Sequence, residues 1–217
     1  MFWNLLLAHF IGDFLLQTDW MVRNRDRFWV LILHVGIHFG AMLLLIGDAR
    51  SEYWILIILI ALIHFGQDAL KIFFVRKLPA WSVPAFILDQ ILHYSIIWAF
   101  VWFYSTGTGK LVLTQKTNWV IFGISYIFVT FVWFITEKVI YQFNPDHIVR
   151  INETKYSRML ARSGMVSVFL LIRTWVFPGL AIVLPNPYSS TEYRQRFLLT
   201  DLGVSTFAFA FLFWALG

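Results

Sequence analysis

Apolar and polar positions divide the chain into long hydrophobic runs that are separated by short polar links. A helix that crosses a bilayer needs about 20 mostly apolar residues, and the pattern predicts seven such spans. The predicted spans are residues 2–19, 28–47, 53–74, 86–104, 118–141, 164–184 and 197–217. We therefore expect an all-α fold: a polytopic integral membrane helical bundle that forms a single membrane domain.

Each of the first four predicted spans interrupts its apolar run with two polar residues four positions apart. The pairs are His9 with Asp13, His34 with His38, His64 with Asp68, and Asp89 with His93. Residues four apart share one face of a helix, with their Cβ atoms about 5–6 Å apart. Each pair can therefore direct two side chains at one point.

The distribution of Lys and Arg among the links predicts the orientation of the spans. With seven spans, the even-numbered links hold five basic residues, and the odd-numbered links hold eleven when Lys71 and Lys138, near the ends of the third and fifth spans, are counted with the links that follow them. Because basic links favour the cytoplasmic side, we expect the N-terminus outside and the C-terminus inside. In this orientation all four polar pairs lie about 10 Å below the cytoplasmic surface. That common depth predicts a four-helix polar core built from the first four spans.

Composition supports a membrane location and limits the ligand chemistry. The chain is 59% hydrophobic and 13% charged, whereas soluble domains are about 25% charged. It contains no Cys, so a bound metal ion must be held by nitrogen and oxygen atoms. The net charge of +5 is explained by basic links that face anionic lipid headgroups. We therefore expect membrane lipids as partners and no nucleic acid.

Three interpretations of the polar pairs compete. A charge in mid-membrane costs at least about 2.5–3.5 kcal/mol, so the three Asp and five His residues need partners. In the first interpretation they bind divalent metal ions, with zinc preferred over manganese or iron. Eight ligands are more than one tetrahedral ion can use, so two or more ions are expected. In the second they form a proton or cation path, and in the third they only join helices. We favour the first, because contacts between helices tend to use Ser, Thr, Asn and Gln.

Several single residues receive more specific expectations. Asp89 is the shallowest residue of the predicted site and is the candidate for a catalytic base instead of a ligand. Gln17 lies four positions after Asp13, where it would either hydrogen-bond a ligand or be an ordinary polar residue at the membrane interface. Arg173 lies inside the sixth predicted span, where it would bind a substrate phosphate or pair with Glu137. Residues 144–163 are polar, basic and broken by a proline, and predict an interfacial amphipathic segment.

Four short sequences carry a resemblance to a known family. The runs AHFIGDFLLQTDW, HVGIH, HFGQD and LDQILH resemble an uncharacterised bacterial integral membrane family that is catalogued as a domain of unknown function. The resemblance covers residues 8–93, and RSGMVSVFLLIR at 162–173 matches more loosely. It implies a location in the bacterial cytoplasmic membrane and supplies no activity.

A second, shorter resemblance bears on chemistry. HFIGD, and less closely HFGQD, are similar to the HxxxD zinc-ligand motifs of the zinc phospholipase C and P1 nuclease superfamily, which are all-helical phosphodiesterases. The N-terminal Trp ligand and the Pro-Leu-His continuation of that superfamily are absent. The likeness implies that His9, Asp13, His64 and Asp68 are zinc ligands.

The function expected from the sequence is therefore a metal-dependent hydrolase of a lipid or phosphoester. A metal-ion or proton transporter is the second expectation, although no inverted repeat of the kind found in many transporters is visible. A structural membrane protein is the third.

Overall fold

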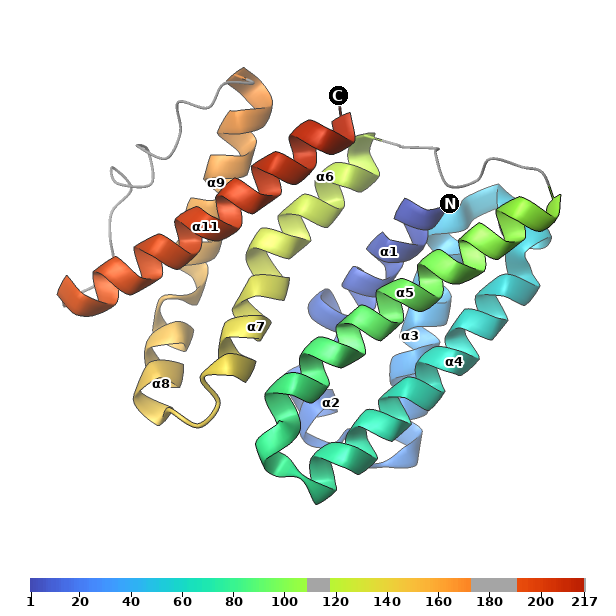
Figure 1. The fold of residues 1–217 in the computed structure, drawn as a ribbon, viewed down its shortest axis with the longest axis horizontal. Helices are drawn as coiled ribbons and strands as arrows, with labels where there is room; N and C mark the ends of the chain where they lie inside the picture. Colours follow the sequence, from blue (N-terminus) through green and yellow to red (C-terminus); the bar gives the residue numbers. More distant parts are fainter. Residues whose placement is uncertain (109–117, 173–190, 217) are drawn as a thin grey trace. The chain divides into compact units, whose positions relative to one another are not determined.

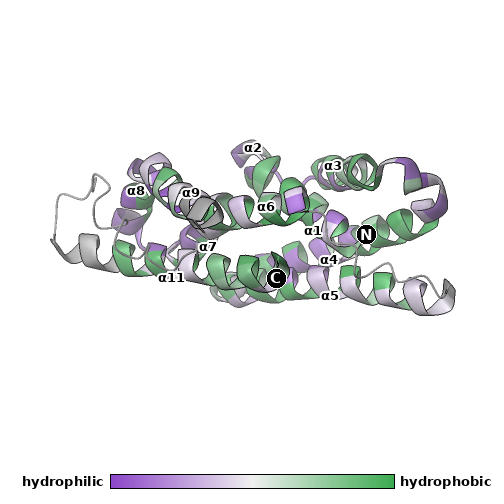
Figure 2. Cartoon of the chain, turned by 90° about the horizontal axis from the view of Figure 1, so that it is seen from above, coloured by the Kyte–Doolittle hydropathy of each residue, from purple (hydrophilic) through white to green (hydrophobic). Residues whose placement is uncertain are grey.

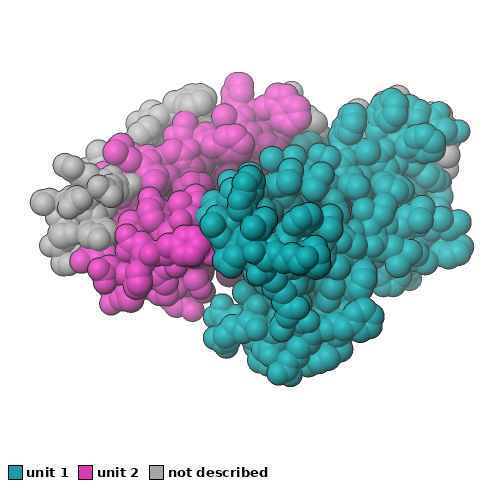
Figure 3. Space-filling model, turned by 60° about the horizontal axis from the view of Figure 1, so that its bottom comes forward, with its two compact units in different colours: residues 1–120 teal, residues 121–217 magenta. Residues whose placement is uncertain are grey.

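The computed structural model describes residues 1–108, 118–172 and 191–216, and these residues form helices and turns without a strand. The chain divides into two compact units, Met1–Val120 and Ile121–Gly217, which Figure 3 shows in different colours. The all-α prediction is confirmed. Arg173 and most of the sixth predicted span lie outside the described residues.

Unit 1 is built from four main helices and one short one. Its elements are α1 (Phe2–Phe10), a π-helical turn (Ile11–Leu15), α2 (Asp19–Arg23), α3 (Phe28–Ile46), α4 (Arg50–Lys77) and α5 (Ser82–Thr108). Helix α1 packs against α3 and α5, and α4 packs against the same two helices (Figure 1). The four helices therefore form a closed ring, as the predicted four-helix core requires.

Local sequence explains where the helices of unit 1 begin and end. The hydroxyl of Thr18 accepts a hydrogen bond of 3.3 Å from the backbone N–H of Met21 and caps α2, a role that Thr favours. Gly47 ends α3 with a φ of +63°, which glycine adopts without steric cost. Pro79 lies two residues after the end of α4 at Lys77, where a proline prevents the helix from continuing.

Unit 1 buries its paired polar side chains and exposes many large apolar ones. On α4, for example, Ile55 and Leu62 are exposed, whereas His64 and Asp68 are buried. Large exposed apolar surfaces are rare on soluble monomers and suit a helix surrounded by lipid. Within residues 1–108, 118–172 and 191–216, four helical stretches are long and apolar enough to cross a membrane: Phe28–Lys77, Pro79–Gly107, Asn118–Ile140 and Phe197–Leu216. Figure 2 shows their predominantly hydrophobic colouring.

The first predicted span differs from the structure. The apolar helix at the N-terminus covers Phe2–Leu15, and 14 residues reach only about 21 Å, less than the roughly 30 Å of a bilayer core. The stretch Phe28–Lys77 contains the predicted second and third spans, because α3 and α4 are joined by a turn at Gly47–Ala49. The total of seven spans stays a prediction.

Unit 2 contains the remaining helices of the described residues, the first of which begins three residues before the boundary of the unit at Ile121. They are α6 (Asn118–Ile127), a π-helical turn (Phe128–Val132), α7 (Trp133–Ile140), α8 (Pro145–Glu153), α9 (Lys155–Ile172) and α11 (Thr191–Leu216). The predicted interfacial segment 144–163 is divided between α8 and α9 at Thr154. Its amphipathic character is visible in α8, where Ile151 is buried and the helix is largely hydrophilic in colour (Figure 2).

A buried ionic network joins α7, α9 and α11. Both carboxylate oxygens of Glu137 accept hydrogen bonds of 2.7 Å from Arg158, which also donates to Asp201. Arg162 donates to Asp201 over 2.8 Å. The suggested partner of Arg173, Glu137, is therefore occupied by Arg158. Arg158 and Arg162, counted above among the basic residues of the fifth link, are buried and paired.

Candidate metal centre

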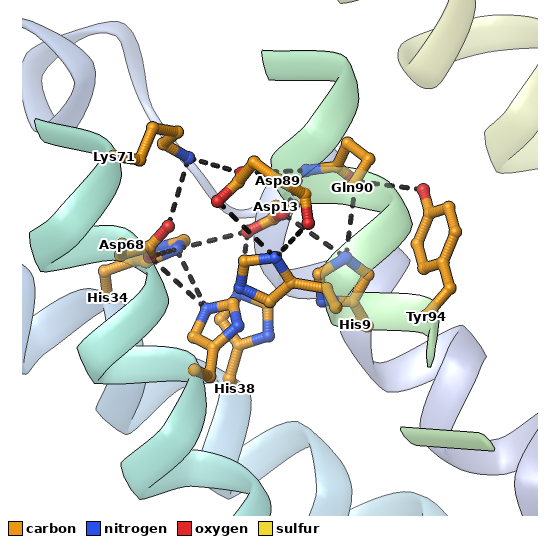
Figure 4. A network of polar contacts seen from close by, with 11 residues as sticks. His9, Asp13, His34, His38, Asp68, Lys71, Asp89, Gln90 and Tyr94 are labelled. Atoms are coloured by element: carbon orange, nitrogen blue, oxygen red, sulfur yellow. Dashed lines mark hydrogen bonds and ion pairs between the residues drawn. The ribbon is translucent and has the colours of Figure 1, made fainter. Parts of the chain in front are cut away.

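The ring of four helices brings all eight polar residues of the predicted pairs together at its centre, and Figure 4 labels six of them. Each of the eight side chains is buried, with exposed fractions between 2% and 8%. Two come from the first helical segment, two from α3, two from α4 and two from α5. The i, i+4 spacing gives each helix one polar face, and the ring turns the four faces towards each other.

The carboxylate of Asp13 lies among three histidines. Its Oδ1 is 2.9 Å from Nε2 of His38 and 3.1 Å from Nε2 of His34. Its Oδ2 is 3.4 Å from Nε2 of His9. Asp13 belongs to the π-helical turn Ile11–Leu15, and such turns occur often at functional sites.

The carboxylate of Asp68 continues this arrangement. Its Oδ2 lies 3.2 Å from Nε2 of His34 and 3.4 Å from Nε2 of His64. The two Nε2 atoms are themselves 3.4 Å apart. Nε2 of His34 therefore lies close to two carboxylates and to His64. Because it carries at most one proton, it cannot donate a hydrogen bond to all three neighbours at once.

His93 has a ring nitrogen that takes part in no hydrogen bond within the described residues and could bind a metal ion. Its Nδ1 is 2.7 Å from the backbone carbonyl oxygen of Asp89. A carbonyl oxygen only accepts, so Nδ1 carries the proton and neutral His93 presents a lone pair on Nε2. This Nε2 is buried and has no hydrogen-bond partner among the residues that the structure describes. The ring of His93 lies 4.2 Å from that of His64 and 5.1 Å from that of His9, measured between centroids.

The potential ligand atoms form two adjoining sets. One set is Asp13, His34, His38 and His64, and the other is His64, Asp68 and His93; within each set these atoms lie no more than 4.8 Å apart. Zinc binds nitrogen and oxygen ligands at about 2.0–2.2 Å, so two ligands of one ion are at most about 4.4 Å apart. Small side-chain rotations would therefore allow each set to surround an ion.

Lys71 is part of the site, although its place near the end of the third predicted span had assigned it to the basic residues of the third link. Its Nζ donates to Oδ1 of Asp68 over 3.0 Å and to Oδ2 of Asp89 over 2.6 Å. The Lys71 side chain is 19% exposed, so it lies between the buried histidines and the surface. Its i, i+3 spacing from Asp68 is the sequence signal that could have identified it.

Gln90 and Tyr94 hold Asp13 from the side of α5, and they too were not predicted. The amide nitrogen of Gln90 donates to Oδ2 of Asp13 over 3.0 Å, and its oxygen accepts from the hydroxyl of Tyr94 over 2.9 Å. Gln17, which was expected to fill such a role, does not continue the helical face of Asp13, because the helix ends at Leu15.

The charges of the site favour a cation. Three carboxylates and one ammonium give two net negative charges when the histidines are neutral. Five imidazoles whose rings lie about 4–6 Å from their neighbours cannot all be protonated, because adjacent like charges repel strongly in a buried site. One divalent ion would neutralise the site. The donor set consists of imidazole nitrogen and carboxylate oxygen, which suits zinc, manganese and iron.

Apolar side chains close one end of the site. Leu5, Ile57, Ile97 and Val101 are buried beyond the histidines, and a cavity of about 10 Å³ separates part of this layer from the imidazoles. Such a volume holds about one water molecule. Lys71 marks the opposite, more accessible end, so the site opens to one side.

A family model described as "Protein of unknown function (DUF3307)" matches residues 1–122. These residues are more than half of the 217-residue chain. The chain belongs to this family. The matched region contains every residue of the candidate metal centre, and most of unit 2 lies beyond it. No curated protein and no solved structure matches the chain.

Proposed function

We propose that this member of the DUF3307 family is a membrane metalloprotein that holds two divalent ions, zinc before manganese or iron. The observation that carries the proposal is the buried, unpartnered Nε2 lone pair of His93. Hydrogen bonding between helices would leave no reason to bury that atom without a partner, since unsatisfied buried polar groups are costly. A metal ion accepts such a lone pair directly.

We further propose that the site hydrolyses a phosphoester in a lipid. Bound divalent ions supply Lewis acidity and activate water at neutral pH. Two ions would leave the site with two surplus positive charges, which an anionic substrate would offset. An anionic phosphoester therefore suits the charge of the site better than a neutral ester.

Side chains around the metal centre would bind the substrate, accept a proton and exclude water. The ammonium of Lys71, at the accessible end of the site, is placed to bind a phosphate oxygen. Asp89 is held by Lys71 at 2.6 Å and belongs to neither set of potential ligands, so it stays the candidate for the base that takes a proton from water. The buried apolar layer around Ile57 and Ile97 keeps bulk water from the opposite end.

Transport is the second candidate and is less well supported. A transporter needs a polar path to both faces of the membrane, and the apolar layer blocks one end of this site in the conformation that the structure describes. We also propose that the protein resides in the bacterial cytoplasmic membrane with its N-terminus outside. The basic residues Arg25, Arg76 and Lys77 lie at the same end of unit 1, which agrees with a common side for the first and third links.

Elemental analysis of the detergent-purified protein tests metal binding. We expect about two transition-metal ions per chain in the wild type and a clear loss in His38→Ala and Asp68→Ala. His147→Ala is the control. His147 is the sixth histidine of the chain and lies in unit 2, so this variant should retain both ions. Less than one-tenth of an ion per wild-type chain would overturn the proposal.

The type of activity is tested separately. Metal-loaded protein in proteoliposomes should release a phosphorylated headgroup from phosphatidylglycerol, and Asp89→Asn should stop this release while keeping the metal. Uptake of metal ions into the proteoliposomes without any lipid hydrolysis would instead establish the transporter.

A further inference from the structure

A second cavity of about 330 Å³ lies at the accessible end of unit 1, between the link that joins α2 to α3 and the last turns of α4. None of the residues that line it belongs to the metal centre. Its volume is at the lower end of the range for small-molecule sites. The space is therefore large enough for a polar headgroup, and too small for a whole membrane lipid.

The charge of this cavity is positive. Arg25, Arg76 and Lys77 line it together with a single carboxylate, that of Asp26, which leaves two net positive charges. Arg76 donates to Asp26 over 2.8 Å, and the two side chains are 61% and 48% exposed. Exposed pairs of this kind contribute at most about 1 kcal/mol, so a phosphate can compete for Arg76.

The rim of the cavity is apolar and aromatic. Phe28 and Phe73 also line it and are 69% and 50% exposed. The ammonium of Lys77 lies 4.3 Å from the centroid of the Phe73 ring, a cation–π distance that keeps the charge beside the apolar rim. Exposed aromatic and basic side chains at the ends of apolar helices are typical of the membrane interface.

We propose that this cavity binds the phosphate of an anionic phospholipid, with the acyl chains following the exposed rings of Phe28 and Phe73. A free phosphate ion would use the cations alone and would gain nothing from the apolar rim. Leu31 lines the cavity one helical turn before His34, and Ile72 does so one turn beyond Asp68. The bound headgroup therefore lies within about 5–6 Å, along the helix axes, of the metal centre.

The inference goes beyond the proposed function and does not require it. The cavity, its charge and its aromatic rim are present whether or not the metal centre binds ions. If the centre does act on lipid phosphoesters, the cavity would hold a neighbouring lipid or the substrate close to it.

The test is a binding titration of the full-length protein in a neutral detergent with dioctanoyl phosphatidylglycerol and, separately, dioctanoyl phosphatidylcholine. Each basic side chain that contacts the headgroup should contribute about a fivefold gain in affinity. We therefore expect the Arg76→Gln, Lys77→Gln double variant to bind phosphatidylglycerol at least tenfold more weakly. Arg50→Gln, which removes an exposed cation at the opposite end of α4, is the matched control and should bind normally.

One variant should gain affinity, so that loss of folding cannot account for the result. Asp26→Asn releases Arg76 and removes the only carboxylate of the cavity, and we expect phosphatidylglycerol to bind it several-fold more tightly than it binds wild type. Chelation of metal should leave the ratios between the wild-type and variant affinities unchanged, which separates the outcome from that of the metal centre.

Three results would overturn the inference. They are equal affinity for the two lipids, equal losses in the double variant and in Arg50→Gln, and displacement of the lipid by an equal concentration of inorganic phosphate. The last result would show a site for a free anion.

Discussion

Gly12 lies directly against the imidazole of His38, at a distance that leaves no room for a side chain on residue 12. A Cβ atom built on Gly12 would be 2.4 Å from both Cε1 and Nε2 of His38. Gly12 belongs to the π-helical turn that also carries Asp13. The absence of a side chain at residue 12 is therefore what allows His38 to reach the carboxylate of Asp13.

Gly12→Ala should consequently displace the His38 ring and reduce metal binding by at least one ion per chain. The measurement is metal content after purification and dialysis. Gly36→Ala is the control, because a Cβ on Gly36 of α3 meets nothing within 4 Å. The control should bind normally and gain stability, by up to about 1 kcal/mol, since alanine favours a helix over glycine. Equal metal content in both variants would contradict the role assigned to Gly12.

His93 and His38 should respond differently to removal of metal. His38→Ala breaks the 2.9 Å contact with Asp13, so it should destabilise the protein with or without metal. His93→Leu removes an Nε2 that has no partner in the described part of the chain, and the hydrogen bond that is lost is the one from Nδ1 to the Asp89 carbonyl. We therefore expect His93→Leu to change the melting temperature of the chelator-treated protein less than His38→Ala does.

The metal-loaded state completes this test. Added zinc should raise the melting temperature of wild type, because a ligand that binds only the folded state stabilises it, and the increase should be smaller in His93→Leu. If His93→Leu gains as much from zinc as wild type does, then His93 is not a ligand.

The arrangement of the polar centre could largely be predicted from the sequence, because a four-residue spacing fixes which side chains share a helical face. Four such faces in consecutive helices then have one low-energy arrangement in lipid, with the polar sides facing inwards. The π-helical turn at Ile11–Leu15 could not be predicted, since the pattern of apolar and polar residues does not show where an α-helix changes to π geometry or ends. Gln17 was assigned to the helical face of Asp13 for the same reason, although the helix ends at Leu15, before Gln17 is reached.

Lys71 and the arginines of unit 2 were misassigned for a different reason. Counts of basic residues per link treat each Lys or Arg as a solvent-facing charge, and the counts cannot recognise a cation that is paired inside the bundle. Asp68 three residues before Lys71 was a local signal. Asp201, the partner of Arg158 and Arg162, is about 40 positions away, and no local pattern connects residues at that separation.

Lys71→Met should make the centre depend more strongly on metal. The variant leaves Asp68 and Asp89 without their shared ammonium, at 3.0 Å and 2.6 Å in the wild type, and raises the net negative charge of the site from two to three. The chelator-treated variant should therefore melt at a lower temperature than wild type, while the metal-loaded variant should recover most of the loss. Lys77→Met, which removes an exposed lysine two turns further along α4, should show neither effect.

Arg158→Met should destabilise unit 2 and leave the metal centre unchanged. Arg158 is the shared partner of Glu137 and Asp201, and its removal leaves a buried carboxylate without a cation, which costs about 3–5 kcal/mol. Arg158→Lys should recover little of this loss, because an ammonium cannot reproduce the two parallel hydrogen bonds of the guanidinium to Glu137. Thermal unfolding of the purified protein, with Arg50→Met as the exposed control, measures the effect. A loss of metal from Arg158→Met at a temperature where the protein is folded would contradict the independence of the two units' polar networks.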